Sequence, residues 1–166
     1  MEKIRNAKLS VNGYRPDLYS HPLIVVDDNE DDGQFLVQAL EICRNPQQSI
    51  IEFRSGNDFL NFADELKSSY AHIPDAHEKI PDMIFLDLLM PGLTGQDVLK
   101  ILRADSFWDD VPIMVSTQLH DDDVIYEIIQ HGANGMLMKP YDKIEVLGAL
   151  KKTNHFANYE TQGHWI

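Results

Sequence analysis

Four short apolar runs of this chain each end in side chains that can do chemistry. In chain order, these ends carry the pair Asp27 and Asp28, then Asp87, the pair Ser116 and Thr117, and Lys139. A carboxylate such as Asp87, which lies inside the run IFLDLLMPG, is costly to remove from water unless a partner compensates its charge. If the four ends meet, their three carboxylates repel one another and require a cation. The fold must therefore decide whether these residues form one site.

The elements that must position these residues alternate between strand and helix five times. Short apolar runs, typical of strands buried on both faces, predict strands at 23–26, 49–53, 82–87, 111–117 and 135–139. Helical spacing of apolar residues predicts helices at 31–44, 56–70, 94–105, 121–132 and 143–152. This alternation predicts an α/β fold, a doubly wound, five-stranded parallel sheet of the flavodoxin-like type with strand order 2-1-3-4-5.

That strand order makes the first, third, fourth and fifth strands neighbours, so their carboxyl ends surround one pocket. Oxygen ligands favour a hard cation, above all Mg²⁺, which often bridges to a phosphate. Lys139 adds a second positive charge, and Thr117 adds a hydroxyl donor. This set suits a phosphoryl group on Asp87, because aspartate can act as a phosphoryl nucleophile and transfer depends mainly on positioning and charge neutralisation.

The chain divides into one domain with additions. We expect an N-terminal extension at 1–20, a single domain at 21–152 with an inserted loop at about 70–81, and an irregular tail at 153–166. The loop carries His72 and His77, but it lacks the third ligand of a metal site, so we interpret it as a solvated loop.

Charge and composition exclude several classes of function. Lys and Arg total 14 and Asp and Glu total 27, which gives a net charge of −13. This balance opposes direct binding of nucleic acid and of anionic membranes. No apolar stretch reaches the roughly 18 residues of a membrane span, and the N-terminal sequence lacks the apolar segment of a signal peptide. We therefore expect a cytoplasmic protein. Its only cysteine, Cys43, excludes an internal disulfide and is expected to be half-buried near a helix end.

Two local predictions concern the helix at 31–44. Asn29 or Asp31 is the expected N-cap, because a side-chain oxygen there accepts hydrogen bonds from the first free backbone N–H groups. Helical spacing places Phe35 on the inward face together with Leu36, Ala39, Leu40 and Cys43. We interpret the other acids of the first turn only as charges that favour the positive end of the helix: Glu30, Asp31 and Asp32.

The chain resembles the receiver domain of the two-component response regulator family. Four segments carry the resemblance, in order and each at a strand end, over roughly 22–150: LIVVDDNEDD, MIFLDLLMPGLTG, PIMVST and GANGMLMKP. The resemblance implies Mg²⁺-dependent phosphoryl transfer to Asp87 from a sensor histidine kinase or a histidine phosphotransfer protein. It implies a phosphoacceptor rather than an enzyme, with at most slow self-catalysed phosphorylation from small donors and slow self-dephosphorylation.

The same resemblance assigns roles to individual residues. Asp28 ligates the metal directly, Asp27 acts through water, and Asp87 and the backbone carbonyl of Leu89 complete the protein ligands. Mg²⁺ is the expected ion, with Mn²⁺ as an alternative. Lys139 corresponds to the lysine that stabilises the phosphoryl group.

The switch hydroxyl and the residues around it follow from spacing. Thr117 lies 22 positions before Lys139 (139 − 117), which fits an ungapped match to the family. Ser116 is the alternative, because a shift of the strand by one residue turns the neighbouring side chain to the other face. Pro140 follows Lys139 at a position where the family often has a cis peptide bond.

Two positions depart from the family pattern. Gln118 stands where the family usually has a small residue after the switch hydroxyl, and it is placed to crowd the acceptor. Met136 stands where the family usually has the aromatic residue of the switch. Methionine is flexible enough to repack, so we expect a less discrete switch than an aromatic ring gives.

Two other functions of similar parallel sheets lack a residue or loop that they would need. An aspartate-dependent phosphatase would need a second acid two residues after the first, where this chain has Leu89. A flavodoxin would need a phosphate-cradling loop after the first strand, where this chain has DDNEDD. The alternative that we keep is a pseudo-receiver that serves as a phosphorylation-independent protein-binding module.

Output is expected through protein contact, as in stand-alone receivers, because no output domain fits after residue 150. The chain shows a weaker likeness to stand-alone regulators that partner bacterial phytochromes. A downstream protein, or a second copy in a homodimer, is expected to use the face formed by the fourth strand, the helix after it, the fifth strand and the last helix. Its apolar residues are Ile125, Ile128, Ile129, Met136 and Met138.

Overall fold

The computed structural model describes residues 21–44, 48–74 and 79–151. The expected extension at 1–20 and the expected tail at 153–166 lie outside these ranges, as does part of the expected loop at 70–81. The strands are β1 Leu23–Val26, β2 Ile50–Phe53, β3 Met83–Asp87, β4 Ile113–Thr117 and β5 Gly135–Met138. The helices are α1 Glu30–Cys43, α2 Gly56–Tyr70, α3 Gly95–Arg103, α4 Asp122–Gln130 and α5 Lys143–Leu150, with a short 3₁₀ helix at Ser106–Trp108.

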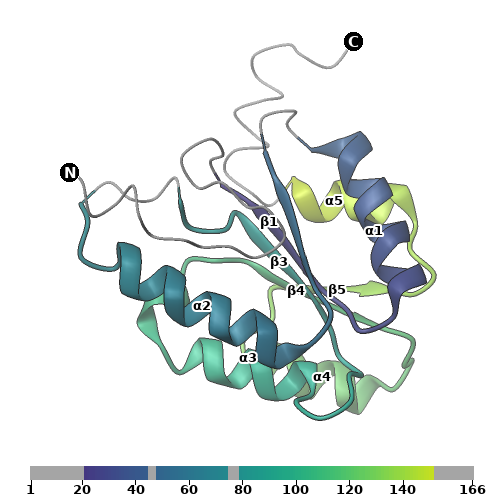
Figure 1. Cartoon of the computed structure of the whole chain (residues 1–166). Coiled ribbons are helices and arrows are strands. Elements are labelled where there is room, and N and C mark those ends of the chain that lie inside the picture. The colour runs from purple at the N-terminus through teal and green to yellow at the C-terminus, as the bar shows by residue number, and fades with distance from the viewer. Residues whose placement is uncertain (1–20, 45–47, 75–78, 152–166) are drawn as a thin grey trace.

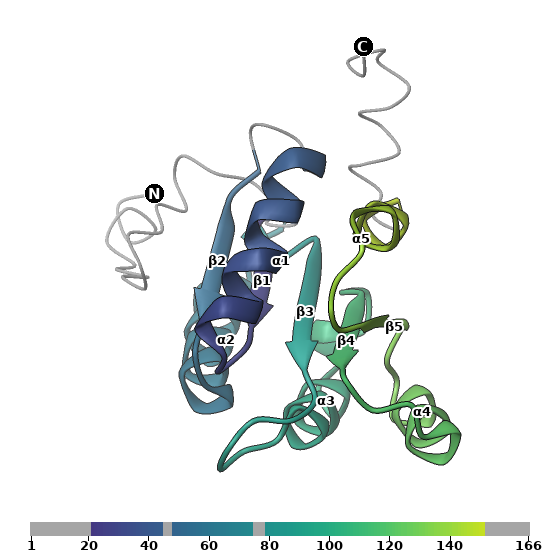
Figure 2. The ribbon, with the colours of Figure 1, turned by 90° about the vertical axis from the view of Figure 1, so that its right-hand side faces the viewer.

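The five strands form one parallel sheet in the order β2-β1-β3-β4-β5, which confirms the predicted fold class and topology. Helices cover both faces (Figures 1 and 2). Helices α1 and α5 lie side by side on one face, and α2, α3 and α4 lie on the other. Each connection from strand to strand crosses over a helix, as parallel pairing requires.

Alternating side chains of the strands fill two separate cores. Val26, Ile84 and Val115 point to the side of α2, α3 and α4. Val25 and Phe85 point to the side of α1 and α5. Because both faces are covered, β1, β3 and β4 are buried along their whole length, which explains their continuous apolar runs. Within the described ranges, no helix combines the length and the apolar character needed to cross a bilayer.

Local signals at α1 gave one correct prediction and two that differ from the structure. Asn29 is the N-cap, and its side chain accepts hydrogen bonds from the backbone N–H groups of Asp31 and Asp32. Phe35 does not face the core, because 47% of its surface is exposed. It lies about 100° around the helix axis from Leu36, outside the stripe that the sheet covers. Cys43 is buried at the last position of α1, deeper than expected.

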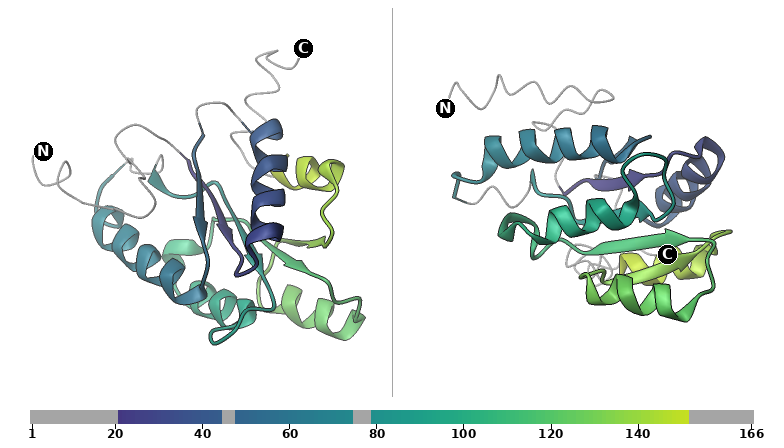
Figure 3. Two further views of the ribbon diagram at one scale, coloured as in Figure 1. Left: turned by 45° about the vertical axis from the view of Figure 1, so that its right-hand side comes forward. Right: turned by 90° about the horizontal axis from the view of Figure 1, so that it is seen from below.

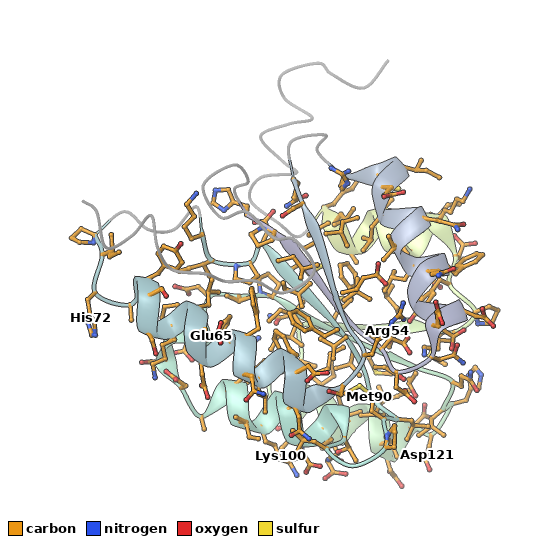
Figure 4. All side chains as sticks on the ribbon, in the orientation of Figure 1. Arg54, Glu65, His72, Met90, Lys100 and Asp121 are labelled. Atoms are coloured by element: carbon orange, nitrogen blue, oxygen red, sulfur yellow. The ribbon has the colours of Figure 1, made fainter. Side chains whose placement is uncertain are left out.

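The strand register aligns the strand ends that carry the candidate site residues at one edge of the sheet. Val26 pairs with Leu86, so Asp27 follows β1 at the level of Asp87. Asp87 in turn pairs with Ser116 of β4. The views in Figure 3 show the loops that follow the strands gathered at this edge. In Figure 4, the labelled Arg54, Met90 and Asp121, which follow three different strands, lie toward this end, whereas His72 lies at the opposite end.

Candidate functional site

The acid pair after β1 combines one buried and one exposed carboxylate. Asp27 is 2% exposed, and its Oδ1 accepts a hydrogen bond of 2.9 Å from the backbone N–H of Asn29. Asp28 is exposed. The turn after β1 therefore directs one carboxylate into the sheet edge and leaves the other open to solvent.

Asp87 is the last residue of β3 and is only 5% exposed. Its Oδ1 accepts a hydrogen bond of 3.4 Å from the backbone N–H of Leu89. Burial raises the pKa of Asp87 to about 6, and the nearby charge of Asp27 adds to this effect, while Lys139 and the Leu89 N–H partly offset it. Near neutral pH, Asp87 is therefore ionised in most molecules, and its carboxylate can act as a nucleophile.

Lys139 follows β5 and joins three carboxylates. Its Nζ lies 2.9 Å from Oδ2 of Asp27, 3.1 Å from Oδ2 of Asp32 and 3.4 Å from Oδ2 of Asp87. Burial alone acts to lower the pKa of Lys139, but the hydrogen bond to Asp27 and the surrounding negative charges outweigh it and raise the pKa above its ordinary value. The peptide bond from Lys139 to Pro140 is cis, in line with the resemblance.

The three acids fit a hard divalent cation. One carboxylate oxygen from each of Asp27, Asp28 and Asp87 lies within 4.8 Å of the other two. Lys139 supplies a single positive charge to this cluster, so a further cation would relieve the remaining repulsion. All the donors are oxygens, which is the ligand set of Mg²⁺ and Mn²⁺.

The two candidate switch hydroxyls have different hydrogen-bond partners. Ser116 pairs with Leu137, whose side chain belongs to the core under α1 and α5, and its hydroxyl is hydrogen-bonded to Tyr141. Thr117 is the last residue of β4, and its Oγ1 accepts a hydrogen bond of 3.0 Å from the backbone N–H of Leu119. Both hydroxyls are buried.

The two departures from the family pattern lie in different surroundings. Gln118 is exposed directly after Thr117. Met136 is partly buried in β5 and packs against the core on the side of α2, α3 and α4. The side chain at the usual aromatic position is therefore already packed inward.

Sequence reasoning missed two residues that touch the site. Asp32 does more than favour the end of α1, because its carboxylate contacts Lys139, which is 107 positions away. Tyr141 is 6% exposed, and its hydroxyl donates to Oδ2 of Asp27 at 3.5 Å. A first-turn acid and an aromatic residue after a proline both have ordinary local explanations, so only the fold exposes these contacts.

Gly95 fixes the backbone that carries the acceptor. Its N–H donates to the carbonyl of Leu88 at 3.1 Å, and it begins α3 directly against the end of β3. A Cβ at this position would lie 2.0 Å from the carbonyl oxygen of Asp87 and 2.8 Å from Cα of Leu88. No such contact is tolerated, so any side chain here must displace the backbone of the site.

We expect Gly95→Ala to lower the free energy of unfolding by about 2 kcal/mol or more, because overpacking against backbone finds no flexible neighbour to move. Gly148→Ala in α5 is the matched control, because nothing lies within 4 Å of a Cβ there. That change should stabilise the protein by about 0.5–1 kcal/mol through helix propensity. Urea unfolding of the two variants measures both effects, and equal stabilities would contradict the close approach at Gly95.

Comparison with known proteins agrees with this geometry. The family model described as the response regulator receiver domain matches residues 23–151. The regulatory protein LuxO of Vibrio vulnificus is 34% identical over 90 residues, which cover 52% of this chain and 19% of LuxO. The chain spans less than a third of the length of the curated relatives that it matches.

Solved structures show the same fold. The chemotaxis response regulator CheY4 of Vibrio cholerae superimposes with a TM-score of 0.62 at 23% identity, over 80% of this chain and 97% of that one. The bacteriophytochrome response regulator AtBRR gives a TM-score of 0.60 at 22% identity, over 78% of this chain and 94% of that one.

Receiver domains accept a phosphoryl group and are not enzymes in the usual sense. They bind Mg²⁺ through acidic residues, and they interact with histidine kinases or phosphotransfer proteins. The matched segment includes every strand of the sheet and every residue of the acidic pocket. The chain therefore belongs to the response regulator receiver domain family, which operates by phosphoaspartate signalling in two-component systems.

Proposed function

We propose that this protein accepts a phosphoryl group on Asp87 from a sensor histidine kinase or a histidine phosphotransfer protein. The observation that carries the proposal is the position of Asp87, buried at the end of β3 with the ammonium of Lys139 3.4 Å away and two further acids beside it. An oxygen of the Asp87 carboxylate attacks phosphorus, the bond from phosphorus to the donor nitrogen breaks, and an acyl phosphate forms.

The side chains around Asp87 have the positions that this transfer needs. Lys139 already reaches Asp87 and can neutralise charge on the phosphoryl oxygens. Thr117 is the better candidate for the switch hydroxyl. Its oxygen accepts from Leu119, which leaves the hydroxyl proton to be donated. Ser116 is engaged with Tyr141 on the α5 side of the sheet.

We assign the metal ligands as the resemblance implies: Asp28 and Asp87 directly, the Leu89 carbonyl, and Asp27 through water. The indirect role of Asp27 is supported by its contacts, because Oδ1 is bonded to the Asn29 N–H and Oδ2 to Lys139. A bound Mg²⁺ would neutralise charge on the phosphoryl oxygens. Mn²⁺ offers the same chemistry, and the response regulator Rcp1, a structural neighbour at 21% identity with a TM-score of 0.61, is described in a Mn²⁺-bound form.

We propose that the protein passes its signal on by binding a partner protein at the face formed by β4, α4, β5 and α5. Tyr126 and Ile129 of α4 are 67% and 42% exposed, so this face presents apolar groups to a partner. Ile128 is fully buried beside them and ties α4 to the core. A downstream target, or a second copy of the chain, is the proposed occupant.

Incubation of the protein with acetyl phosphate and Mg²⁺ tests the proposed acceptor. We expect one adduct of phosphoryl mass, located by peptide mapping on the segment that contains Asp87, and no adduct when a chelator removes the metal. An adduct on another residue would overturn the assignment. Failure of both acetyl phosphate and phosphoramidate to label the protein would favour the pseudo-receiver.

A further inference from the structure

Tyr141 is a buried phenol that the proposed transfer does not use. It lies between the cis Lys139–Pro140 bond and α5, in the core under α1 and α5. Its hydroxyl contacts Oδ2 of Asp27 at 3.5 Å and is also hydrogen-bonded to Ser116. The phenol therefore connects the end of β4 to the acid that follows β1.

The chemistry of these groups fixes the direction of the two hydrogen bonds. A carboxylate only accepts, so the single phenolic proton of Tyr141 is donated to Asp27. The phenolic oxygen is then the acceptor for the hydroxyl of Ser116. The result is a chain of donors from Ser116 through Tyr141 to Asp27, in which Ser116 acts on the carboxylate only through the phenol.

Two donors share one oxygen of Asp27. Lys139 lies 2.9 Å from Oδ2, and the Tyr141 hydroxyl lies 3.5 Å from the same atom. Lys139 also contacts Asp32 and Asp87, so its three protons are divided among three carboxylates. The nearer donor to Oδ2 of Asp27 is therefore Lys139, which also contacts two other carboxylates.

Phosphorylation changes this division. A phosphoryl group on Asp87 adds charge and acceptor oxygens directly beside Lys139. As Lys139 turns toward those oxygens, Oδ2 of Asp27 loses its nearer donor. A buried carboxylate with an unmatched oxygen is costly, so a second donor already aimed at Oδ2 lowers the free energy of the phosphorylated state.

We propose that Tyr141 is a positioning residue that keeps Asp27 hydrogen-bonded when Lys139 turns to the phosphoryl group, and that Ser116 holds the phenol in place. This inference rests on the proposed acceptance of phosphate at Asp87. It assigns a role to Ser116, which precedes the proposed switch residue Thr117, and to Tyr141, which would otherwise be explained as a residue of the hydrophobic core.

Tyr141→Phe tests the role, because it keeps the ring and removes only the hydroxyl. Titration with Mg²⁺ alone, and then with beryllofluoride at saturating Mg²⁺, separates the metal site from the mimic of the phosphorylated state. We expect Mg²⁺ affinity to stay within about twofold and beryllofluoride affinity to fall about tenfold, as for loss of a hydrogen bond to a charged group. Ser68→Ala, which removes an exposed hydroxyl of α2, is the control and should change neither affinity.

Ser116→Ala examines the same chain from its other end and leaves the ring untouched. It should weaken beryllofluoride binding in the same direction by a smaller factor, and Tyr141→Phe with Ser116→Ala should be no weaker than Tyr141→Phe alone. Additive effects would show that Ser116 does not act through the phenol.

Three further outcomes would overturn the inference. The first is an unchanged affinity of Tyr141→Phe for beryllofluoride. The second is an equal loss of Mg²⁺ affinity, which would place the phenol in the metal site alone. The third is a wild-type protein that binds Mg²⁺ but not beryllofluoride, which would overturn the proposed function together with this inference.

Discussion

Asp87→Asn is expected to abolish the phosphoryl adduct formed from acetyl phosphate and Mg²⁺. The amide has no oxygen of sufficient nucleophilicity, while its size and burial are nearly those of the carboxylate at the end of β3. Intact-mass measurement should show the adduct in the wild type and in the control Asp64→Asn, an exposed acid of α2 far from the sheet edge in sequence and fold. An adduct of equal amount in Asp87→Asn would assign the acceptor to another residue.

Asp87→Asn should also raise the free energy of unfolding near neutral pH. The pKa of Asp87 is raised to about 6 in the folded protein, so the native state binds this proton more tightly than the unfolded chain. The stability that protonation of Asp87 supplies is complete below about pH 4 and is lost as pH rises through about 6. In metal-free buffer near neutral pH, Asp87→Asn should therefore be more stable than the wild type, by about 2 kcal/mol.

Urea unfolding at a series of pH values measures this difference, which should shrink as pH falls from about 6 and vanish below about pH 4, as Asp87 becomes protonated in the unfolded chain as well. A difference that is constant across this range would show that repulsion and burial at Asp87 are not its cause. Adding Mg²⁺ should reduce the advantage of the variant, because the wild type retains its third acidic ligand.

Lys139→Met is expected to destabilise the metal-free protein by about 3–5 kcal/mol near neutral pH, the usual cost of leaving a buried charge without its partner. The side chain of Lys139 is 5% exposed, and it contacts Asp27, Asp32 and Asp87. Methionine preserves much of its length and packing, so the loss reports the charge. The variant should also fail to form the phosphoryl adduct, because it lacks the cation that faces Asp87.

Two conditions should restore part of the lost stability. Lower pH protonates Asp87, and Mg²⁺ supplies a replacement charge to the three acids. Lys100→Met, at an exposed lysine of α3, is the matched control and should change the free energy of unfolding by less than about 0.5 kcal/mol. If the two variants unfold alike, the ion pairs of Lys139 do not stabilise the fold.

The sheet could be predicted from the sequence because β1, β3, β4 and β5 are apolar runs that end in, or are followed by, a residue that can do chemistry. For β1 and β3 the end is an aspartate, and for β5 it is a lysine, so the strand order alone brought Asp27, Asp87 and Lys139 together. Helix starts were equally readable where a side chain caps the backbone, as Asn29 does.

The remaining contacts depend on distances that no local pattern encodes. Asp32 has the ordinary charge of a first helical turn, and only the packing of α1 against β1 and α5 brings it within 3.1 Å of Lys139. Phe35 fits the helical period, but the sheet covers a narrower stripe than the period allows. The contact of Tyr141 with Asp27 depends on the path of the chain after Pro140, which residue types do not reveal.

The ion pair between Lys139 and Asp27 joins residues 112 positions apart. All four strand pairings are parallel, so each must close a loop that includes a helix before it gains a hydrogen bond. During synthesis, the acids of β1 and β3 leave the ribosome long before the lysine that neutralises them. A partly made chain therefore carries the acceptor without its counter-charge, and competence to accept phosphate arrives together with completion of the domain.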